Sequence, residues 1–285
     1  MDTQPSTHSS SSSYAYVSPR FPCFYDAWVY YLFGSKSIDT EVYLSQLPYN
    51  NKSPVIVDLF TGSGRVLKEI IASGRAPGAT LYGIDHSPAM LARASTTTAL
   101  TGGVKWRCAS ATSFASALDD DDGGAKADLL IASAGSVSHL IHRDEVRGLL
   151  TEVARALAVG GVAVVSVLAE MLAETAGAGE DDIGLLTFPC EDDGEGRKGR
   201  WVKSPTVATW DGSGRVRVDT FQVEFYEDGV EQVVWREELK WSLATFDEGQ
   251  WAADVAEAQL EIAEIVPESE VNGQRFYVLK KALTG

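Results

Sequence analysis

An alternation of apolar runs with amphipathic stretches, between residues 54 and 168, constrains the fold of this chain more than any other feature. The apolar runs predict strands at residues 54–59, 80–84, 104–108, 128–132 and 162–168. The amphipathic stretches predict helices at residues 65–73, 88–99 and 143–157. Strands that alternate with helices pair in parallel through right-handed crossovers, and such a doubly wound sheet binds ligands outside the carboxyl ends of its strands. We therefore expect function at the turns that follow the strands.

The pattern changes after residue 174. Residues 175–199 contain six glycines and seven acids, which predicts a mobile, acidic surface loop. Runs of β-branched and aromatic residues follow, and Asp-Gly turns separate them. They predict a three-stranded antiparallel meander over residues 200–210, 216–226 and 231–243.

The end of the chain returns to the first pattern. A helix is expected at residues 246–259, and strands at 261–266 and 275–283 rejoin the main sheet. The fold expected is α/β: a doubly wound, Rossmann-like, mostly parallel seven-stranded sheet with the antiparallel meander inserted as a cap. Residues 54–174 and 244–285 then form the ligand-binding domain, and residues 175–243 form the loop and cap over its mouth.

The residues before the first strand divide into two parts. Residues 1–13 are polar, with five consecutive serines, and predict a disordered tail. Apolar residues recur at helical spacing from Tyr25 to Leu47, with a break at Gly34, which predicts two helices. Residues 14–53 are therefore expected to form an N-terminal helical lid.

Composition excludes several classes of protein. The formal net charge is −16, which disfavours nucleic acid and anionic lipid as partners. The three cysteines lie far apart, which argues against a disulfide framework or a zinc site and favours a reducing compartment. The longest apolar stretch, 156–169, is shorter than the roughly 20 residues that cross a bilayer. We expect a cytoplasmic monomer or homodimer that binds a small molecule and neither nucleic acid, membrane nor metal.

The sharpest motif is the sequence VIVDLFTGSG at residues 55–64, an apolar strand that ends in an acid and runs into Gly62 and Gly64. Glycines let the backbone approach a ligand closely, and the following helix offers free N–H groups. The carboxylate of Asp58 can only accept hydrogen bonds. The motif therefore indicates a site for a cationic or hydroxyl-rich ligand.

A second acid, Asp85, ends the next strand, twenty-one residues after Gly64. A carboxylate there can accept from both hydroxyls of a ribose, which suits a nicotinamide dinucleotide or another adenosine cofactor. The third glycine of the dinucleotide motif would fall at position 67, which is Leu67. Asp58 would also repel a pyrophosphate, so both residues weigh against the dinucleotide.

These motifs resemble those of the class I S-adenosylmethionine-dependent methyltransferases, in particular small-molecule enzymes of the glycine N-methyltransferase-like type. The similarity covers residues 25–168 and resumes at 246–283. The resemblance implies S-adenosyl-L-methionine as cofactor. It places the amino-acid end of that cofactor at Gly62 and Gly64, with Asp58 near the ammonium and Asp85 on the ribose.

The resemblance extends to the turns after the other strands. It implies that His86 and Met90 lie beside the adenine ring, and that Ala111 and Thr112 lie near its edge. The turn after the fourth strand, with Ser133, Ser138 and His139, would line the methyl-transfer cavity. Of these turn residues, Ser133 and Ser138 are assigned to the cofactor. His139 is the candidate general base, although a lone histidine at a strand end is more often a structural residue.

Three further features bear on the site. Tyr25 and Tyr30 resemble the aromatic entry helix that closes over the cofactor, although packing of an amphipathic helix is an equal explanation. Phe60 stands where the family usually has the first glycine of its loop, and Ser110 where an aspartate usually meets the adenine amino group. The tryptophans of the cap are expected in its core, with one or two in the acceptor pocket. They are Trp201, Trp210, Trp235, Trp241 and Trp251.

The function expected is in-line methyl transfer to a nitrogen or oxygen of a small acceptor, within small-molecule or secondary metabolism. Such a reaction needs alignment of nucleophile, methyl carbon and sulfur, and a base only if the acceptor must lose a proton. Two alternatives stay open. One is a cyclase or lyase that keeps the fold and the cofactor without transferring methyl, motivated by Phe60 and Ser110. The other is a non-catalytic interaction protein.

Overall fold

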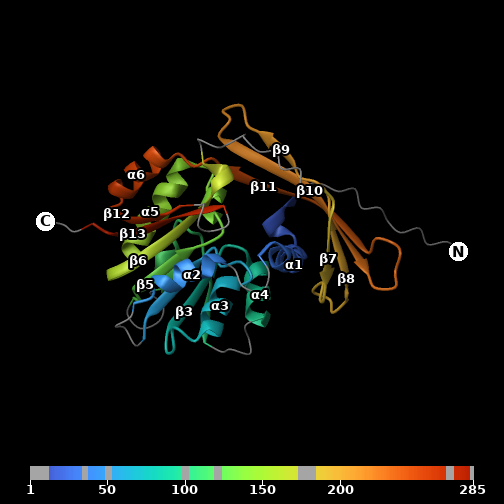
Figure 1. Cartoon of the computed structure of the whole chain (residues 1–285), viewed down its shortest axis with the longest axis horizontal. Helices are drawn as coiled ribbons and strands as arrows, with labels where there is room; N and C mark the ends of the chain where they lie inside the picture. The colour runs from blue at the N-terminus through green and yellow to red at the C-terminus, as the bar shows by residue number, and fades with distance from the viewer. Residues whose placement is uncertain are drawn as a thin grey trace.

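The computed structural model describes residues 13–33, 38–48, 53–97, 103–118, 124–172, 184–267 and 273–282. Its strands form two sheets, and helix α1 (Phe21–Phe33) lies between them (Figure 1). Within the described residues, no helix is both long enough and apolar enough to cross a membrane.

The larger sheet has seven strands in the order β12-β13-β6-β5-β2-β3-β4. Pairing is parallel from β6 through β5, β2 and β3 to β4, and β13 runs antiparallel to both β6 and β12. The predicted mostly parallel seven-stranded sheet is therefore confirmed. The strands are β2 (Val55–Leu59), β3 (Thr80–Asp85), β4 (Val104–Cys108), β5 (Ala127–Ala132), β6 (Leu157–Leu168), β12 (Leu260–Val266) and β13 (Gln274–Lys281).

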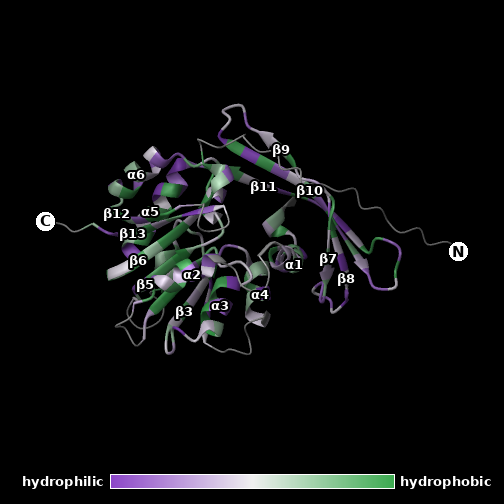
Figure 2. Cartoon of the chain, viewed as in Figure 1, coloured by the Kyte–Doolittle hydropathy of each residue, from purple (hydrophilic) through white to green (hydrophobic). Residues whose placement is uncertain are grey.

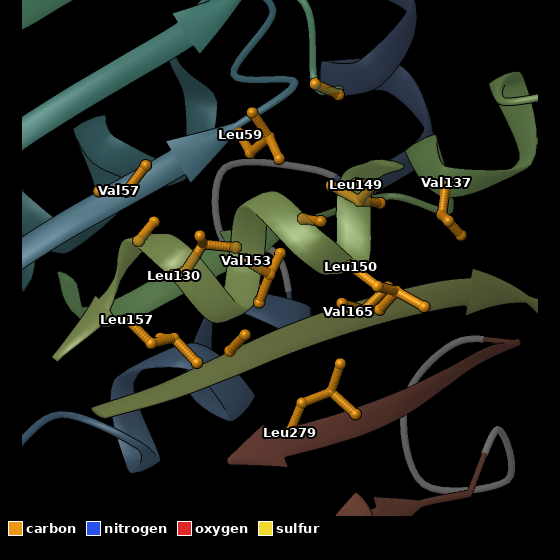
Figure 3. Packing of buried hydrophobic residues seen from close by; sticks show 14 of the residues in the cluster. Val57, Leu59, Leu130, Val137, Leu149, Leu150, Val153, Leu157, Val165 and Leu279 are labelled. Carbon is orange, nitrogen blue, oxygen red and sulfur yellow. The ribbon is translucent and has the colours of Figure 1, made fainter. Parts of the chain in front are cut away.

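Helices cover both faces of this sheet because the strand side chains alternate between two apolar clusters. On one face Val57 of β2 packs with Leu150 and Val153 of α5 (Figure 3). On the other face Ile56 packs with Ile70 of α3. The helices are α2 (Ile38–Ser45), α3 (Arg65–Ser73), α4 (Pro88–Thr97), α5 (Arg143–Ala156) and α6 (Glu248–Glu257). Short 3₁₀ turns are η1 (Ala15–Val17), η2 (Phe114–Leu118), η3 (Ser136–His139) and η4 (Ala169–Met171).

The smaller sheet has the order β1-β11-β10-β8-β7, and β9 also pairs with β10. β10 alternates between buried and more exposed residues, which Figure 2 shows as bands of opposite hydropathy. The buried face, with Phe221, Val223 and Phe225, forms a core with Phe24 of α1. The strands are β1 (Ser13–Tyr14), β7 (Leu186–Cys190), β8 (Gly199–Lys203), β9 (Val207–Trp210), β10 (Val216–Glu227) and β11 (Trp235–Ala244).

The predicted three-stranded meander is wrong in its strand count. Residues 200–210 divide into β8 and β9, which both pair with β10. The predicted loop at 175–199 contains β7, in which Phe188 and Cys190 are buried. Phe24 of α1 supplies that burial, with ring centroids 5.8 Å from Phe188. Pro189, which has no N–H to donate, suits the edge position of this strand.

Two smaller differences concern segment ends. Gly160 and Gly161 lie between the predicted helix at 143–157 and the predicted strand at 162–168. α5 already ends at Ala156, and both glycines lie within β6. The predicted tail except Ser13, the acidic run 119–122, and the first part of the predicted loop, 175–183, lie outside the described residues.

Candidate functional site

The turn from β2 into α3 adopts left-handed backbone at three positions. Gly62 has φ 55° and Gly64, which precedes α3, has φ 83°. A Cβ at Gly64 would approach the Trp106 ring to 2.9 Å, so only glycine fits there. Phe60 also has φ 57°, a conformation that costs a residue with a side chain about 1–2 kcal/mol. Phe60 therefore adopts the backbone conformation that a glycine would have at this position, and the backbone is locally strained there.

Asp58 lies fully buried at the end of β2. Its Oδ2 accepts a hydrogen bond from the Thr61 hydroxyl at 2.7 Å. Its Oδ1 is buried and has no hydrogen-bond partner in the described part of the chain. Burial raises the pKa of Asp58 to about 7, although the Thr61 hydroxyl and the nearby Arg65 oppose the rise. A buried carboxylate oxygen without a donor is a place where a ligand donor would be stabilised.

The Asp85 carboxylate links the loop after β2 to the loop after β3. One carboxylate oxygen accepts from the Gly62 N–H at 2.9 Å, and the other accepts from the Ser87 N–H at 2.8 Å. Burial raises the pKa of Asp85, and these two backbone donors oppose the rise. Each oxygen has a second lone pair, so Asp85 can shape the glycine loop and still accept hydrogen bonds from a ligand.

The helices before β2 reach the glycine loop. Tyr25 of α1 lies 3.8 Å from the position that a Cβ on Gly62 would take. Arg65, the residue after Gly64, forms a two-pronged ion pair with Asp39 of α2, at 3.0 and 2.6 Å. Tyr30, by contrast, is 64% exposed. Five residues of helix turn it about 140° away from Tyr25, so the structure brings only Tyr25 to the loop.

The residues assigned to the adenine lie around the turns after β3 and β4. The Met90 side chain ends 3.6 Å from the Cβ position of Gly62, and His86 lies beside Asp85 with its ring mostly exposed. Ala111 is buried in the core. The Thr112 side chain packs on Gly148 of α5. Ser110 is exposed, and its hydroxyl pairs with that of Thr112.

The turn after β5 is tightly built. Ser133 is buried, and its carbonyl accepts the Ser136 hydroxyl at 2.7 Å. Ala134 has φ 55°, which makes it a second strained residue after Phe60, and β5, which precedes it, pairs with β2, which precedes Phe60. Ser138 is 2% exposed, and its hydroxyl has no partner in the described residues. Strained backbone and an unpaired hydroxyl at a strand end are features of binding sites.

His139 is held at both ring nitrogens. Nδ1 donates to the Ser242 carbonyl at 3.2 Å, so the proton of the neutral ring lies on Nδ1. Nε2 therefore accepts the hydroxyl of Tyr16, 3.0 Å away. Burial lowers the pKa of His139 to about 4 and raises that of Tyr16, so both side chains are neutral at physiological pH. Tyr16 was missed by the sequence reasoning, because it lies in a short 3₁₀ turn without any motif.

Aromatic side chains of the smaller sheet and of α1 meet beside this histidine. Trp241 of β11 stacks on Trp28 of α1 with ring centroids 5.2 Å apart, and lies 6.4 Å from His139. Trp241 is therefore the cap tryptophan nearest the candidate base. Trp201 is fully buried in the core of the smaller sheet. Trp251 was assigned to the cap, but it packs in the core of the larger sheet.

The sequence reasoning also missed a group of ion pairs that joins α1, α4 and the turn between β7 and β8. Arg93 of α4 lies 2.7 Å from Asp26 of α1 and 3.0 Å from Asp192 in the turn between β7 and β8. Arg20, just before α1, pairs with Asp193 of the same turn at 2.8 Å. These contacts tie the helix that covers the glycine loop both to the larger sheet and to the acidic turn. That turn was expected to be mobile, but its described part is held by these pairs.

Comparison with known proteins gives the site its context. Residues 56–161 match a protein family described as methyltransferase domain. N-methyltransferase FrzE of a Cladobotryum species is 32% identical over 155 residues, which are 52% of this chain and 52% of that protein. The aligned part thus spans about half the length of this curated relative. Within the described residues, no group of three or more His, Cys, Asp or Glu is placed to hold a metal ion.

Solved structures share the fold over nearly the whole chain. KedS8, a sugar N-methyltransferase from a Streptoalloteichus species, is 19% identical with TM-score 0.64, over 99% of this chain and 98% of that one. CalS10, an amino pentose methyltransferase from Micromonospora echinaspora solved with S-adenosylmethionine, is 20% identical with TM-score 0.63, over 91% and 97%. Residues 56–161 thus match a methyltransferase domain, and the chain has the fold of these solved S-adenosylmethionine-dependent methyltransferases.

Proposed function

We propose that this protein transfers a methyl group from S-adenosylmethionine to a nitrogen atom of a small molecule. The observation that carries the proposal is Oδ1 of Asp58, a buried carboxylate oxygen without a donor beside the glycine loop. The names of the relatives, an N-methyltransferase and a sugar N-methyltransferase, support nitrogen over oxygen as the acceptor atom.

The residues present fit this cofactor. Asp58 offers its free oxygen to an ammonium group, and Gly62 allows the backbone to approach the amino-acid end. Asp85 keeps lone pairs for the two ribose hydroxyls while it holds the loop. When bound, S-adenosylmethionine supplies an electrophilic methyl group on a positively charged sulfur. The protein's part is to hold the acceptor in line with it and to exclude water.

Tyr16 and His139 are the residues proposed to handle the acceptor. The hydroxyl proton of Tyr16 is committed to Nε2 of His139, which leaves the lone pairs of the Tyr16 oxygen free to accept an N–H of the acceptor amine. A histidine with a pKa of about 4 is a weak base at pH 7. We therefore propose that His139 mainly orients Tyr16, and that the general-base role first considered for it is minor.

The remaining predicted contacts stay part of this proposal. Tyr25 would close over the amino-acid end of the cofactor, and Met90 with His86 would flank the adenine. Ser133 and Ser138 would line the methyl-transfer cavity from the turn after β5. A small-molecule acceptor would bind between this turn and the cap sheet. A cytoplasmic location, a monomeric or dimeric state and the lack of a nucleic-acid partner remain predictions from composition.

Product analysis tests the proposal. The purified protein is incubated with S-adenosylmethionine and a panel of amines, and S-adenosylhomocysteine is quantified by mass spectrometry. The account predicts S-adenosylhomocysteine in equal amount to an acceptor product that is heavier by one methyl group. Turnover of an acceptor without S-adenosylhomocysteine would instead indicate the cyclase or lyase alternative and contradict methyl transfer.

A further inference from the structure

A lysine is buried on the inner face of the cap sheet. Lys203, at the end of β8, is 3% exposed. Its ammonium donates to two neutral oxygens, the Ser204 carbonyl at 3.2 Å and the Thr206 hydroxyl at 2.8 Å. Within the described residues, no carboxylate lies within ion-pair distance of it. A buried ammonium with only neutral partners is costly, so it calls for an explanation.

The nearest acid does not neutralise Lys203. Asp219 of β10 has an oxygen 2.9 Å from Nε of Arg217, and its other oxygen accepts from the Trp241 indole at 3.1 Å. Burial lowers the pKa of Lys203 to about 8, and the field of Asp219 opposes that shift only in part. Arg217 also pairs with Glu170 at 3.0 Å, so both carboxylates of this cluster are engaged by Arg217, and Lys203 has no carboxylate partner among the described residues.

Aromatic residues connect this charge to the site of methyl transfer. The Lys203 ammonium lies 4.7 Å from the Phe221 ring centre and 6.0 Å from that of Trp28. Trp28 in turn contacts Tyr25, the residue over the glycine loop, with ring centroids 6.5 Å apart. The indole N–H of Trp28 is itself buried without a partner in the described part of the chain. The Lys203 ammonium and the Trp28 indole N–H thus border the same group of aromatic rings.

We propose that Lys203 and the Trp28 indole N–H bind a carboxylate at the far end of the acceptor, so that the acceptor is an elongated amino acid. Its amine lies at Tyr16, its apolar middle lies along Trp28 and Trp241, and its carboxylate neutralises Lys203. The two oxygens of a carboxylate each accept at about 2.9 Å, so one group can satisfy both donors. This inference rests on the proposed function, because it extends the same acceptor site.

The probe is 4-(2-aminoethyl)benzoate, which carries an amine and a carboxylate at opposite ends of one ring. Its matched partner is 2-phenylethylamine, which lacks only the carboxylate. Calorimetry measures the affinity of both, with and without S-adenosylhomocysteine. The wild type is expected to bind the benzoate roughly ten- to hundredfold more tightly, as for a charged hydrogen bond at a desolvated site. Lys203→Met should abolish that preference, and Trp28→Phe should reduce it.

Two controls separate binding from folding. Lys198→Met removes an exposed lysine paired with Glu191 at 2.8 Å, and should leave the preference unchanged. Thermal unfolding of Lys203→Met distinguishes a ligand-binding cation from a structural one. Replacing an uncompensated buried charge by an apolar side chain leaves stability unchanged or raises it, whereas loss of a structural cation lowers it.

The outcomes that would contradict the carboxylate site differ from those that would contradict the proposed function. Equal affinity for both probes, no binding of the benzoate, or a preference that survives Lys203→Met would overturn the carboxylate site. A protein that prefers the benzoate but does not bind S-adenosylhomocysteine would retain the site and lose the proposed methyl transfer.

Discussion

The carboxylate of Asp85 accepts a hydrogen bond from the backbone N–H of Gly62 at 2.9 Å. The acid at the end of β3 therefore fixes the glycine loop at the end of β2, in addition to its proposed contact with the ribose. A single residue would thus link the shape of the loop to the proposed recognition of the cofactor.

Asp85→Ala should consequently lower both stability and cofactor affinity. Two buried backbone N–H groups, those of Gly62 and Ser87, lose their acceptor, at about 1–3 kcal/mol each. Chemical denaturation and calorimetry with S-adenosylhomocysteine measure the two effects. Asp211→Ala is the matched control, because Asp211 accepts from two backbone N–H groups in an exposed turn. Cofactor affinity unchanged in Asp85→Ala would refute the double role.

Asp58 should make stability depend on pH in a defined direction. Its pKa is about 7 in the folded protein against an ordinary 3.8. Between these values the native state binds more protons than the unfolded state, so the contribution of Asp58 to stability falls as pH rises. Asp58→Asn lacks this titration. Its Tm relative to that of the wild type should rise between about pH 4 and pH 7, and a constant difference would argue against the shift.

The same carboxyl group should release a proton when the cofactor binds. A bound ammonium favours the ionised form of Asp58, so below pH 7 the binding of S-adenosylhomocysteine should expel a proton. Calorimetry at pH 6 in buffers of different ionisation enthalpy detects it. The wild type should release more protons than Asp58→Asn, and equal release would separate Asp58 from the cofactor ammonium.

The Tyr16–His139 pair should affect turnover more than cofactor binding. Tyr16→Phe keeps the ring but removes the hydroxyl that bridges His139 to the proposed acceptor. We expect kcat to fall about tenfold, with the affinity for S-adenosylhomocysteine unchanged. Because the pKa of His139 is about 4, its protonation should reduce kcat only below about pH 5. A loss of kcat near pH 6.5 that disappears in His139→Gln would contradict this arrangement.

Arg93 should control opening of α1, the helix that covers the glycine loop. Arg93→Met breaks the pairs with Asp26 and Asp192, which join α1 and the acidic turn to α4. Hydrogen exchange of the α1 amides should accelerate, and S-adenosylhomocysteine should dissociate faster. Arg147→Met is the control, since Arg147 pairs with Asp254 and Glu257 of the α5–α6 region. Equal effects of the two variants would remove the special role of Arg93.

Local signals explain which parts of the fold the sequence could predict. α3 was predicted at its observed bounds because Gly64 and Gly74 mark its two ends, and its apolar stripe is continuous. β7 was missed because its burial comes from Phe24, more than 160 residues earlier in the chain. The segment around β7 is rich in glycines and acids, so it was predicted as a loop despite the short apolar alternation of β7.

The site residues also fall into two groups, those that the order of the strands predicts and those that only tertiary packing brings together. Asp58 and Asp85 lie at the ends of neighbouring strands and Gly62 follows the first of them, so their convergence at one sheet edge was predictable from order alone. Tyr16 pairs with His139 across 123 residues, and Lys203 meets Trp28 only through packing of the cap on α1. Such contacts depend on the register of the second sheet, which residue pattern does not specify.

Equilibrium binding of S-adenosylhomocysteine, compared between the wild type and Asp58→Asn at pH 8, tests the central claim most directly. The account predicts saturable one-to-one binding to the wild type and an affinity at least tenfold lower in Asp58→Asn, as expected for loss of a buried charge-assisted hydrogen bond. A folded wild-type protein that binds neither S-adenosylhomocysteine nor S-adenosylmethionine would contradict it.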